Sequence, residues 1–183
     1  MVRPSLSLIR LAAPLLLTFA LVFTPSAPAL AANVETVAFR FVLPTGYQLK
    51  ALPDLGKAPR LLKQWELTRE FGRQRLRIDI EWDRSEVPTK YPVRESRLRA
   101  RRVAEALRYQ NYHCRDLMLK GAPGFYDTWT AQVPPKPRFC VTAAQAFRHG
   151  ARIRIAAIAE PGEGAYVVRT DLHALLNSWA WAD

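Results

Sequence analysis

Residues 75–82 alternate without exception between charged and apolar side chains. The apolar positions are Leu76, Ile78, Ile80 and Trp82, and the charged positions are Arg75, Arg77, Asp79 and Glu81. A period of two places these two sets on opposite faces of a β-strand. The chain must therefore build a sheet that has one apolar face against a core and one charged face toward water or a polar cover.

Extended patterns recur on both sides of this segment. We expect further strands at residues 36–43, 61–69, 115–120, 125–133, 139–147 and 152–159, separated by turns that contain Gly or Pro. Alternation within the segment 125–133 predicts Phe125 and Trp129 on one face of the sheet and Tyr126 on the other.

Two segments change to helical periodicity. Residues 92–111 start with a proline, which suits the first helical position, and carry an apolar stripe made of Val93, Ser96, Ala100, Val103, Ala104 and Leu107. The last segment has a stripe made of Val168, Leu172, Leu175, Leu176 and Trp179. We expect Ile78 and Ile80 to be buried together with Leu172, Leu176 and Trp179. The order of elements predicts an α+β domain, in which a long middle helix and a C-terminal helix pack on an antiparallel β-sheet.

Residues 1–31 have the features of a cleaved signal peptide. Arg3 and Arg10 form a short basic start, an uncharged apolar run follows at residues 11–23, and Ala29-Leu30-Ala31 fits a signal peptidase site. The run is shorter than the ~20 residues that span a bilayer as a helix, although an uncleaved anchor is the alternative. We therefore expect a periplasmic or secreted protein, with one α+β domain at residues 32–183 and no transmembrane segment after cleavage.

Export bears on the redox state of the two cysteines. Cys114 and Cys140 both follow the predicted cleavage site, and an even pair in an oxidising compartment predicts a disulfide bond. A redox-active pair is the alternative, but the two residues lack the Cys-x-x-Cys spacing that lowers a thiol pKa.

The chain is strongly basic, with a formal net charge of +11, and only six of its 27 basic residues are lysines. Such a protein favours acidic partners, which arginine binds through a planar, two-pronged group. The predicted helix at residues 92–111 carries Arg94, Arg97, Arg101 and Arg108 on the side away from its apolar stripe. We expect these four residues to bind an acidic protein or an anionic envelope surface, with a merely solvated helix face as the alternative. Export argues against nucleic acid as the partner.

No residue pattern compels a reaction. His113, His149 and His173 lack the spacing of metal ligands, and no serine lies in a nucleophile elbow. The carboxylates Asp79 and Glu81 alternate with arginines, which favours salt links across the sheet over acid–base catalysis. We therefore expect no catalytic residue, no metal and no cofactor.

A resemblance to a known family supports the same fold. The segment Phe39-Arg40-Phe41-Val42-Leu43-Pro44-Thr45-Gly46-Tyr47 resembles the strand and Pro-x-Gly-aromatic start of the PsbP/DcrB-like (Mog-type) superfamily. The ending Leu175-Leu176-Asn177-Ser178-Trp179 is similar to that family's terminal helix, and the order of elements between the two motifs is also similar. The resemblance implies an α+β fold and a mostly non-catalytic binding role, with no shared catalytic residues to transfer. This chain lacks the lipid-anchored cysteine of many bacterial members.

Together these features favour an exported, non-enzymatic binding or accessory protein that acts on a protein partner or an anionic envelope component. Two alternatives stay open from the sequence. One is a small envelope hydrolase or transferase whose site the sequence hides, and the other is an immunity-type inhibitor of a periplasmic toxin.

Overall fold

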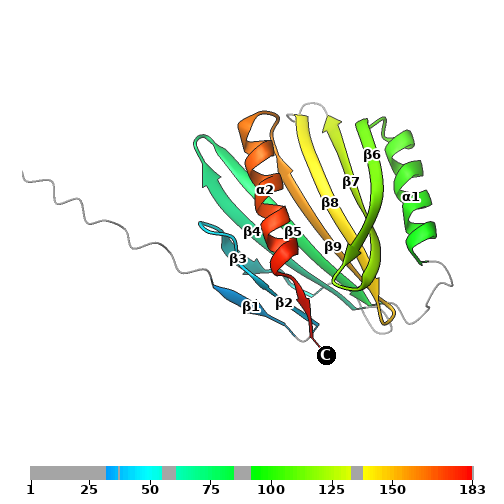
Figure 1. Cartoon of the computed structure of the whole chain (residues 1–183). Helices are drawn as coiled ribbons and strands as arrows, with labels where there is room; N and C mark the ends of the chain where they lie inside the picture. The colour runs from blue at the N-terminus through cyan, green and yellow to red at the C-terminus, as the bar shows by residue number, and fades with distance from the viewer. Residues whose placement is uncertain (1–31, 37, 55–60, 85–91, 133–137, 183) are drawn as a thin grey trace, which may run out of the picture.

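The computed structural model of this chain describes residues 32–36, 38–54, 61–84, 92–132 and 138–182, and the predicted signal peptide at residues 1–31 lies outside them. Figure 1 shows the elements, which are β1 (Asn33–Glu35), β2 (Phe39–Val42), β3 (Gln48–Ala51), β4 (Leu61–Phe71), β5 (Gln74–Arg84), α1 (Pro92–Ala106), β6 (Gln110–Leu119), β7 (Ala122–Gln132), β8 (Arg138–Arg148), β9 (Ala151–Ala159), α2 (Glu163–Ser178) and β10 (Ala180–Trp181).

The described strands form two antiparallel sheets. The large sheet has seven strands in the order β3-β4-β5-β9-β8-β7-β6, and the small sheet has three in the order β1-β2-β10. The α+β class expected from the sequence is therefore correct. The sheet is larger than the sequence pattern implied, and α1, with 15 residues, is no longer than α2, which has 16. The middle helix is thus not a dominant element of the fold.

The strand register sorts the side chains of the large sheet onto two faces. Ile80 lies beside Ile155, which lies beside Ala144, which in turn lies beside Tyr126. These residues define the face that α2 covers, hereafter the α2 face. The alternate positions, Asp127 among them, lie on the opposite face next to α1, hereafter the α1 face. The predicted separation of Tyr126 from its neighbours Phe125 and Trp129 is confirmed.

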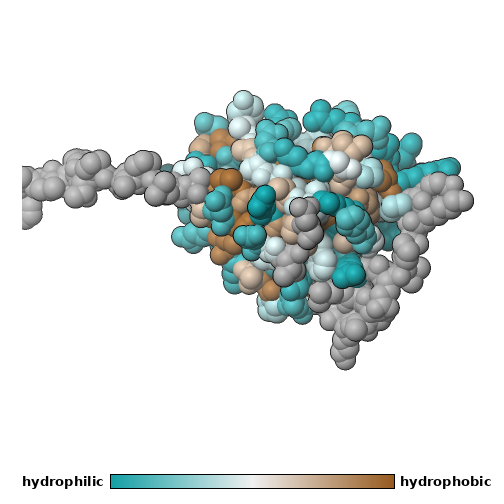
Figure 2. All heavy atoms as spheres, turned by 60° about the horizontal axis from the view of Figure 1, so that its bottom comes forward, coloured by the Kyte–Doolittle hydropathy of each residue, from teal (hydrophilic) through white to brown (hydrophobic). Residues whose placement is uncertain are grey.

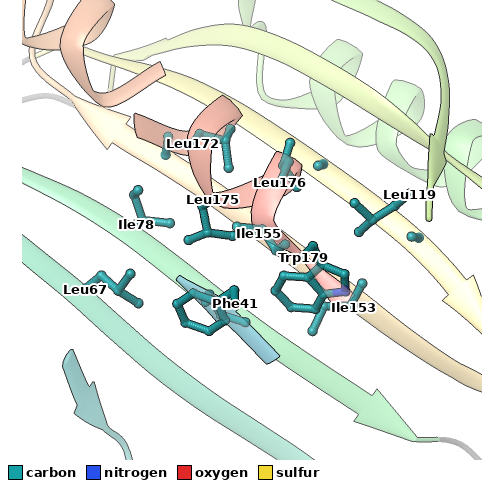
Figure 3. Close-up of a cluster of buried hydrophobic side chains, with 14 of the residues drawn as sticks. Phe41, Leu67, Ile78, Leu119, Ile153, Ile155, Leu172, Leu175, Leu176 and Trp179 are labelled. Atoms are coloured by element: carbon teal, nitrogen blue, oxygen red, sulfur yellow. The ribbon is translucent and has the colours of Figure 1, made fainter. Parts of the chain in front are cut away.

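The hydrophobic core lies between α2 and the large sheet. Figure 3 shows Leu172, Leu175 and Leu176 of α2 directed at strand residues such as Ile78 and Ile155. All members of the predicted core set are buried, and these are Ile78, Ile80, Leu172, Leu176 and Trp179. The apolar stripe of the terminal helix and the alternation of β5 therefore meet as expected.

The end of α2 attaches the small sheet to this core. Trp179 caps the helix in an extended conformation, and its ring stacks on Phe39 with the ring centroids 4.4 Å apart. The hydroxyl of Ser178 donates to the carbonyl of Leu175 at 2.8 Å and accepts the backbone N–H of Val42 at 3.0 Å. The Ser-Trp ending thus holds β2 against the helix terminus.

The first helix ends five residues earlier than the periodicity predicted, at Ala106 rather than at residue 111. Arg108 adopts a positive φ of 53°. Its N–H bonds to the carbonyl of Glu105 at 3.2 Å, and the N–H of Tyr109 bonds to that of Ala104 at 2.9 Å. This pair of bonds is a Schellman motif, which closes a helix through a left-handed residue. Because the motif uses arginine instead of glycine, the sequence gives little warning of it.

The apolar stripe of α1 is only partly covered. Ala104 is buried, whereas the side chains of Val103 and Leu107 are 44% and 59% exposed. The expectation that this stripe packs fully on the sheet is therefore wrong. The helix instead faces the sheet with the small side chains of Ser96 and Ala100, which leaves space between the two layers.

The surface is mixed in character. On the face that Figure 2 shows, hydrophilic side chains surround separate hydrophobic areas. In the described ranges, no helix is both long and apolar enough to cross a membrane.

Candidate functional site

The four arginines predicted to form a binding surface do not all lie on one face of α1. Arg94 is exposed near the start of α1. Arg97 is half-buried and ion-paired with Asp116 of β6, with its guanidinium 5.8 Å from the ring centroid of Phe125. These two interactions tie Arg97 to the sheet.

The remaining two arginines of that set differ from each other. Arg101 pairs with Glu105 on the same helix, with the nitrogen and oxygen atoms 3.0 Å apart. Arg108 lies beyond the end of α1 in the Schellman motif, so the structure does not bring it onto the helix face. Arg97 and Arg101 are thus paired with carboxylates, and Arg108 lies off the helix face.

The predicted disulfide bond is absent. Cys114 lies on β6 opposite Asp127, and Cys140 lies on β8 opposite Thr130. Both thiols are free. The side chains of Asp127 and Thr130 point to opposite faces of β7, so the two cysteines lie on opposite faces of the sheet with a strand between them. The prediction from cysteine count was wrong because count carries no information about strand register.

A different cluster of cationic side chains gathers on the α2 face. It surrounds an open cleft of about 390 Å³, hereafter the cationic cleft, which is lined by His113, Cys114, Arg115, Tyr126, Thr128, Arg169 and His173. The lining combines two arginines, two histidines and two hydroxyl groups. Neither an aspartate nor a glutamate is among these described lining residues.

Three elements position this cleft. His113 and Arg115 are two residues apart on β6 and so share a face of that strand, and Arg169 and His173 are four apart on α2 and so share a side of that helix. Tyr126 of β7 is buried between them. The neighbouring β6–β7 pairing sets Arg115 directly beside Tyr126.

Direct contacts fix the side chains at the cleft floor. The guanidinium of Arg115 lies 4.6 Å from the ring centroid of Tyr126, within the range of a cation–π interaction. The Tyr126 hydroxyl and His173 Nε2 form a hydrogen bond of 3.0 Å. Arg169 is held in turn over the ring of Tyr166, 5.7 Å from its centroid.

The electrostatics of the cleft favour an anion. Burial, followed by the positive charges of Arg115 and Arg169, lowers the pKa of His173. Burial raises the pKa of Tyr126, which keeps its hydroxyl protonated. A neutral His173 can accept a hydrogen bond from the Tyr126 hydroxyl at Nε2, and the two guanidinium groups then remain the charges of the site.

Sequence reasoning did not find this cleft, although two weak signals for it exist. The spacing of two between His113 and Arg115 suits one strand face, and the spacing of four between Arg169 and His173 suits one helix side. Only the fold shows that these two pairs meet. Elsewhere, and within the described residues, no group of three or more His, Cys, Asp or Glu side chains could hold a metal ion.

Comparison with known proteins gives little further information. No family model matches the chain, and no curated protein matches it. Among solved structures, the chain is similar to the crystal structure of LpqN, a protein involved in cell envelope biogenesis of Mycobacterium tuberculosis, with 9% sequence identity and a TM-score of 0.45. The similarity covers 83% of this chain and 90% of LpqN. What the protein binds must therefore be inferred from its own side chains.

Proposed function

We propose that this protein is an exported, non-enzymatic binding protein that captures a phosphate-bearing envelope component in the cationic cleft. One observation carries the proposal. Arg115 of β6 and Arg169 of α2 line the same cleft, and no carboxylate is among the described residues that line it.

The donors of the cleft match a phosphate group. Each guanidinium offers two parallel N–H groups to an oxyanion, and such charge-assisted bonds are about twice as strong as neutral ones. Thr128 adds a hydroxyl donor at the floor, and His173 adds a group that gains a proton when an anion approaches. A phosphate presents several oxygens, so it can use donors from more than one side of the cleft.

The cleft is a better candidate than the arginines of α1. Within the described part of the chain, neither Arg115 nor Arg169 has a carboxylate ion-pair partner, whereas Arg97 and Arg101 both have one. A free guanidinium binds an anion without first breaking a salt bridge. The surface of Arg94, Arg97, Arg101 and Arg108 remains an alternative contact for an acidic partner, and the experiment below separates the two.

Binding suits the cleft better than hydrolysis or group transfer does. The hydrogen bond between Tyr126 and His173 could belong to a catalytic pair, but a catalytic histidine is usually oriented by an acidic residue. The described lining of the cleft contains no such acid. Among the described residues, the hydrogen bond that orients this histidine is made with Tyr126, which suits a role in binding.

Membership of the PsbP/DcrB-like superfamily stays part of this proposal. Two of its motif residues have structural roles that support it. Tyr47, the aromatic residue of the Pro-x-Gly-aromatic start, bonds to Asp171 of α2, and Ser178 of the closing motif bonds to the backbone of β2. Export and a single domain at residues 32–183 are likewise proposed, on the pattern of residues 1–31.

The proposal can be tested with a matched pair of ligands. Glycerol 3-phosphate and glycerol differ only in the phosphate group, and their binding to the ¹⁵N-labelled protein can be followed by NMR. We expect glycerol 3-phosphate to shift resonances of β6, β7 and α2, and glycerol to leave them unchanged. The double variant Arg115→Gln/Arg169→Gln should weaken binding at least about ten-fold, since each lost charged hydrogen bond contributes about 1.5–3 kcal/mol.

The matched control removes the same charge from α1. Arg94→Gln/Arg101→Gln should bind glycerol 3-phosphate as the unmodified protein does. If this control loses binding and the cleft variant retains it, the arginine surface of α1 is the site and the cleft is not. Binding that both variants retain would contradict both locations.

A further inference from the structure

A second cavity, of about 230 Å³, lies on the α1 face of the sheet. It is separated from the cationic cleft by the sheet itself, and we call it the α1 cavity. Helix α1, the segment after it and strands β7, β8 and β9 contribute its lining, which includes Ser96, Ala100, Tyr109, Asp127, Trp129 and Gln145.

The floor of the α1 cavity holds an unusual carboxylate. Asp127 is only 2% exposed, and among the described residues its Oδ1 atom has no hydrogen-bond partner. Gln145 of the neighbouring strand β8 lies on the same floor and is 7% exposed. A buried acceptor without a donor is costly, and native proteins rarely keep one without a purpose.

The nearby arginines do not supply the missing hydrogen bond to Asp127 Oδ1. Arg152 pairs with Asp83 at 3.2 Å and Arg154 pairs with Glu81 at 3.4 Å, and both carboxylates belong to β5. Both guanidinium groups thus have carboxylate partners on β5. The positive charge of Arg154 also acts on the Asp127 carboxyl, but neither arginine donates a hydrogen bond to its Oδ1 atom. The acceptor is available for a donor that enters the cavity.

One wall of the α1 cavity is aromatic. The rings of Tyr109 and Trp129 are nearly parallel, with an interplanar angle of 9° and centroids 5.7 Å apart. Both side chains are half-buried and line the cavity. On the helix side, Ser96 and Ala100 are small and leave this wall uncovered. A planar apolar wall beside a buried carboxylate oxygen that has no donor is the pattern of a site for a ring with a hydrogen-bond donor.

We propose that the α1 cavity binds a small planar ring compound that donates an O–H or N–H hydrogen bond to Asp127. The volume fits this class, because an apolar cavity of about 150 Å³ holds one benzene molecule, whereas drug-sized ligands need roughly 300 Å³ or more. The compound is thus a one- or two-ring molecule. This site is independent of the cationic cleft and of its proposed phosphate.

Phenol and anisole test the proposal directly. They share one ring, but only phenol can donate a hydrogen bond, so the comparison isolates the role of Asp127. The indole N–H of Trp129 and the backbone amides of β7 report binding in NMR spectra of the ¹⁵N-labelled protein. We expect phenol to shift these resonances and to bind about ten-fold more tightly than anisole, as one hydrogen bond to a charged acceptor predicts.

Two variants on α1 form a matched pair. Ala100→Leu fills the cavity from the helix side and should abolish phenol binding. Ala106→Leu places the same side chain at an exposed position outside the lining and should leave binding unchanged. The dispersion of each spectrum shows whether the variant is folded.

Asp127→Leu removes the acceptor and should equalise the affinities for phenol and anisole. Equal binding of the two compounds to the unmodified protein would overturn the role of Asp127. Binding that survives Ala100→Leu would place the ring elsewhere. If neither compound shifts the β7 resonances, the cavity holds only water and the proposal fails.

Discussion

The hydroxyl of Tyr47 donates a hydrogen bond of 3.1 Å to Asp171 Oδ2, which joins the turn before β3 to the middle of α2. The same carboxylate oxygen accepts Arg69 Nη1 at 3.3 Å. Burial, then the negative charge of Asp171, raises the pKa of Tyr47, so the phenol stays protonated and remains a donor. The Pro-x-Gly-aromatic motif therefore connects two segments that are 124 residues apart.

Replacing Tyr47 by phenylalanine removes this donor and keeps the ring. We expect the Tyr47→Phe variant to lose about 1–2 kcal/mol of unfolding free energy, since the acceptor is charged but keeps its bond to Arg69. Urea unfolding at neutral pH measures the loss. A double-mutant cycle with Asp171→Asn should show that most of the loss depends on Asp171. Additive effects of the two substitutions would mean that the bond does not contribute.

The two helices should respond very differently to loss of a leucine side chain. Leu176→Ala empties a buried position of α2 and should cost about 2–5 kcal/mol through lost burial and an unfilled cavity. Leu107→Ala, at a position 59% exposed just after α1, should change stability by less than about 0.5 kcal/mol. Thermal or urea unfolding of both variants checks the pair. A large loss at Leu107 would show that this residue is covered in solution.

Periodicity predicted the elements that bury a face. The alternation of β5 and the stripe of α2 are strong patterns because each is opposed by one continuous apolar surface, and both were predicted correctly. The pattern failed at the end of α1, where Arg108 adopts a conformation that arginine rarely takes. The left-handed backbone conformation of one residue does not change the spacing of the apolar residues, so periodicity could not predict this helix end.

The sites were less predictable because each is built from distant segments. Charge density on one helix drew attention to Arg97 and Arg101. Glu105, four residues after Arg101, is a partner that helical spacing already allows, whereas the partner of Arg97, Asp116 of β6, became evident only in the fold. Asp127 looked like an ordinary charged residue within a strand. Only the pairing of β7 with β8, and the position of α1, explains why its side chain is buried.

The stability of the protein should depend on pH through Asp127. Burial raises the pKa of its carboxyl from 3.8 to about 6. A folded-state pKa above the unfolded value means that the contribution is favourable below about pH 4 and is lost as pH rises through about 6. Asp127→Asn removes the charge, so it should be more stable than the unmodified protein by about 1–3 kcal/mol at pH 7.5 and nearly equal to it at pH 4. Denaturant unfolding at both pH values decides this, and an equal gain at both would exclude ionisation as the cause.

Both cysteines should be titratable as thiols. Because Cys114 and Cys140 lie on opposite faces of the sheet, we expect two thiols per chain in denaturant, even in protein purified from an oxidising compartment. Cys114 is exposed, but partial desolvation raises the pKa of its thiol, so its reaction with a thiol reagent in the folded protein should be slower than that of a thiol with an ordinary pKa at the same pH. A reductant should leave the melting temperature unchanged. If no free thiols are recovered and reduction lowers the melting temperature, the two cysteines form a disulfide bond and this prediction is wrong.

Anion binding in the cationic cleft should be linked to protonation of His173. Burial and the charges of Arg115 and Arg169 lower the pKa of this histidine in the free protein. The negative charge of a bound dianion offsets the two arginine charges and favours the imidazolium, so binding should raise that pKa. Sulfate is a suitable probe because, unlike phosphate, it does not change its charge between pH 5 and 8. By linkage, a pKa that rises on binding requires the affinity for sulfate to increase as pH falls through the range below about 6.5. NMR titration of the His173 ring protons, with and without sulfate, measures the pKa of His173 and the affinity for sulfate.

His113 lines the same cleft, so the variants His173→Gln and His113→Gln should be compared. His173→Gln should remove most of the pH dependence of sulfate binding, and His113→Gln should retain it. If the affinity of the unmodified protein for sulfate is constant with pH, His173 does not take part in anion binding, and Arg115 and Arg169 are the charged donors of the site.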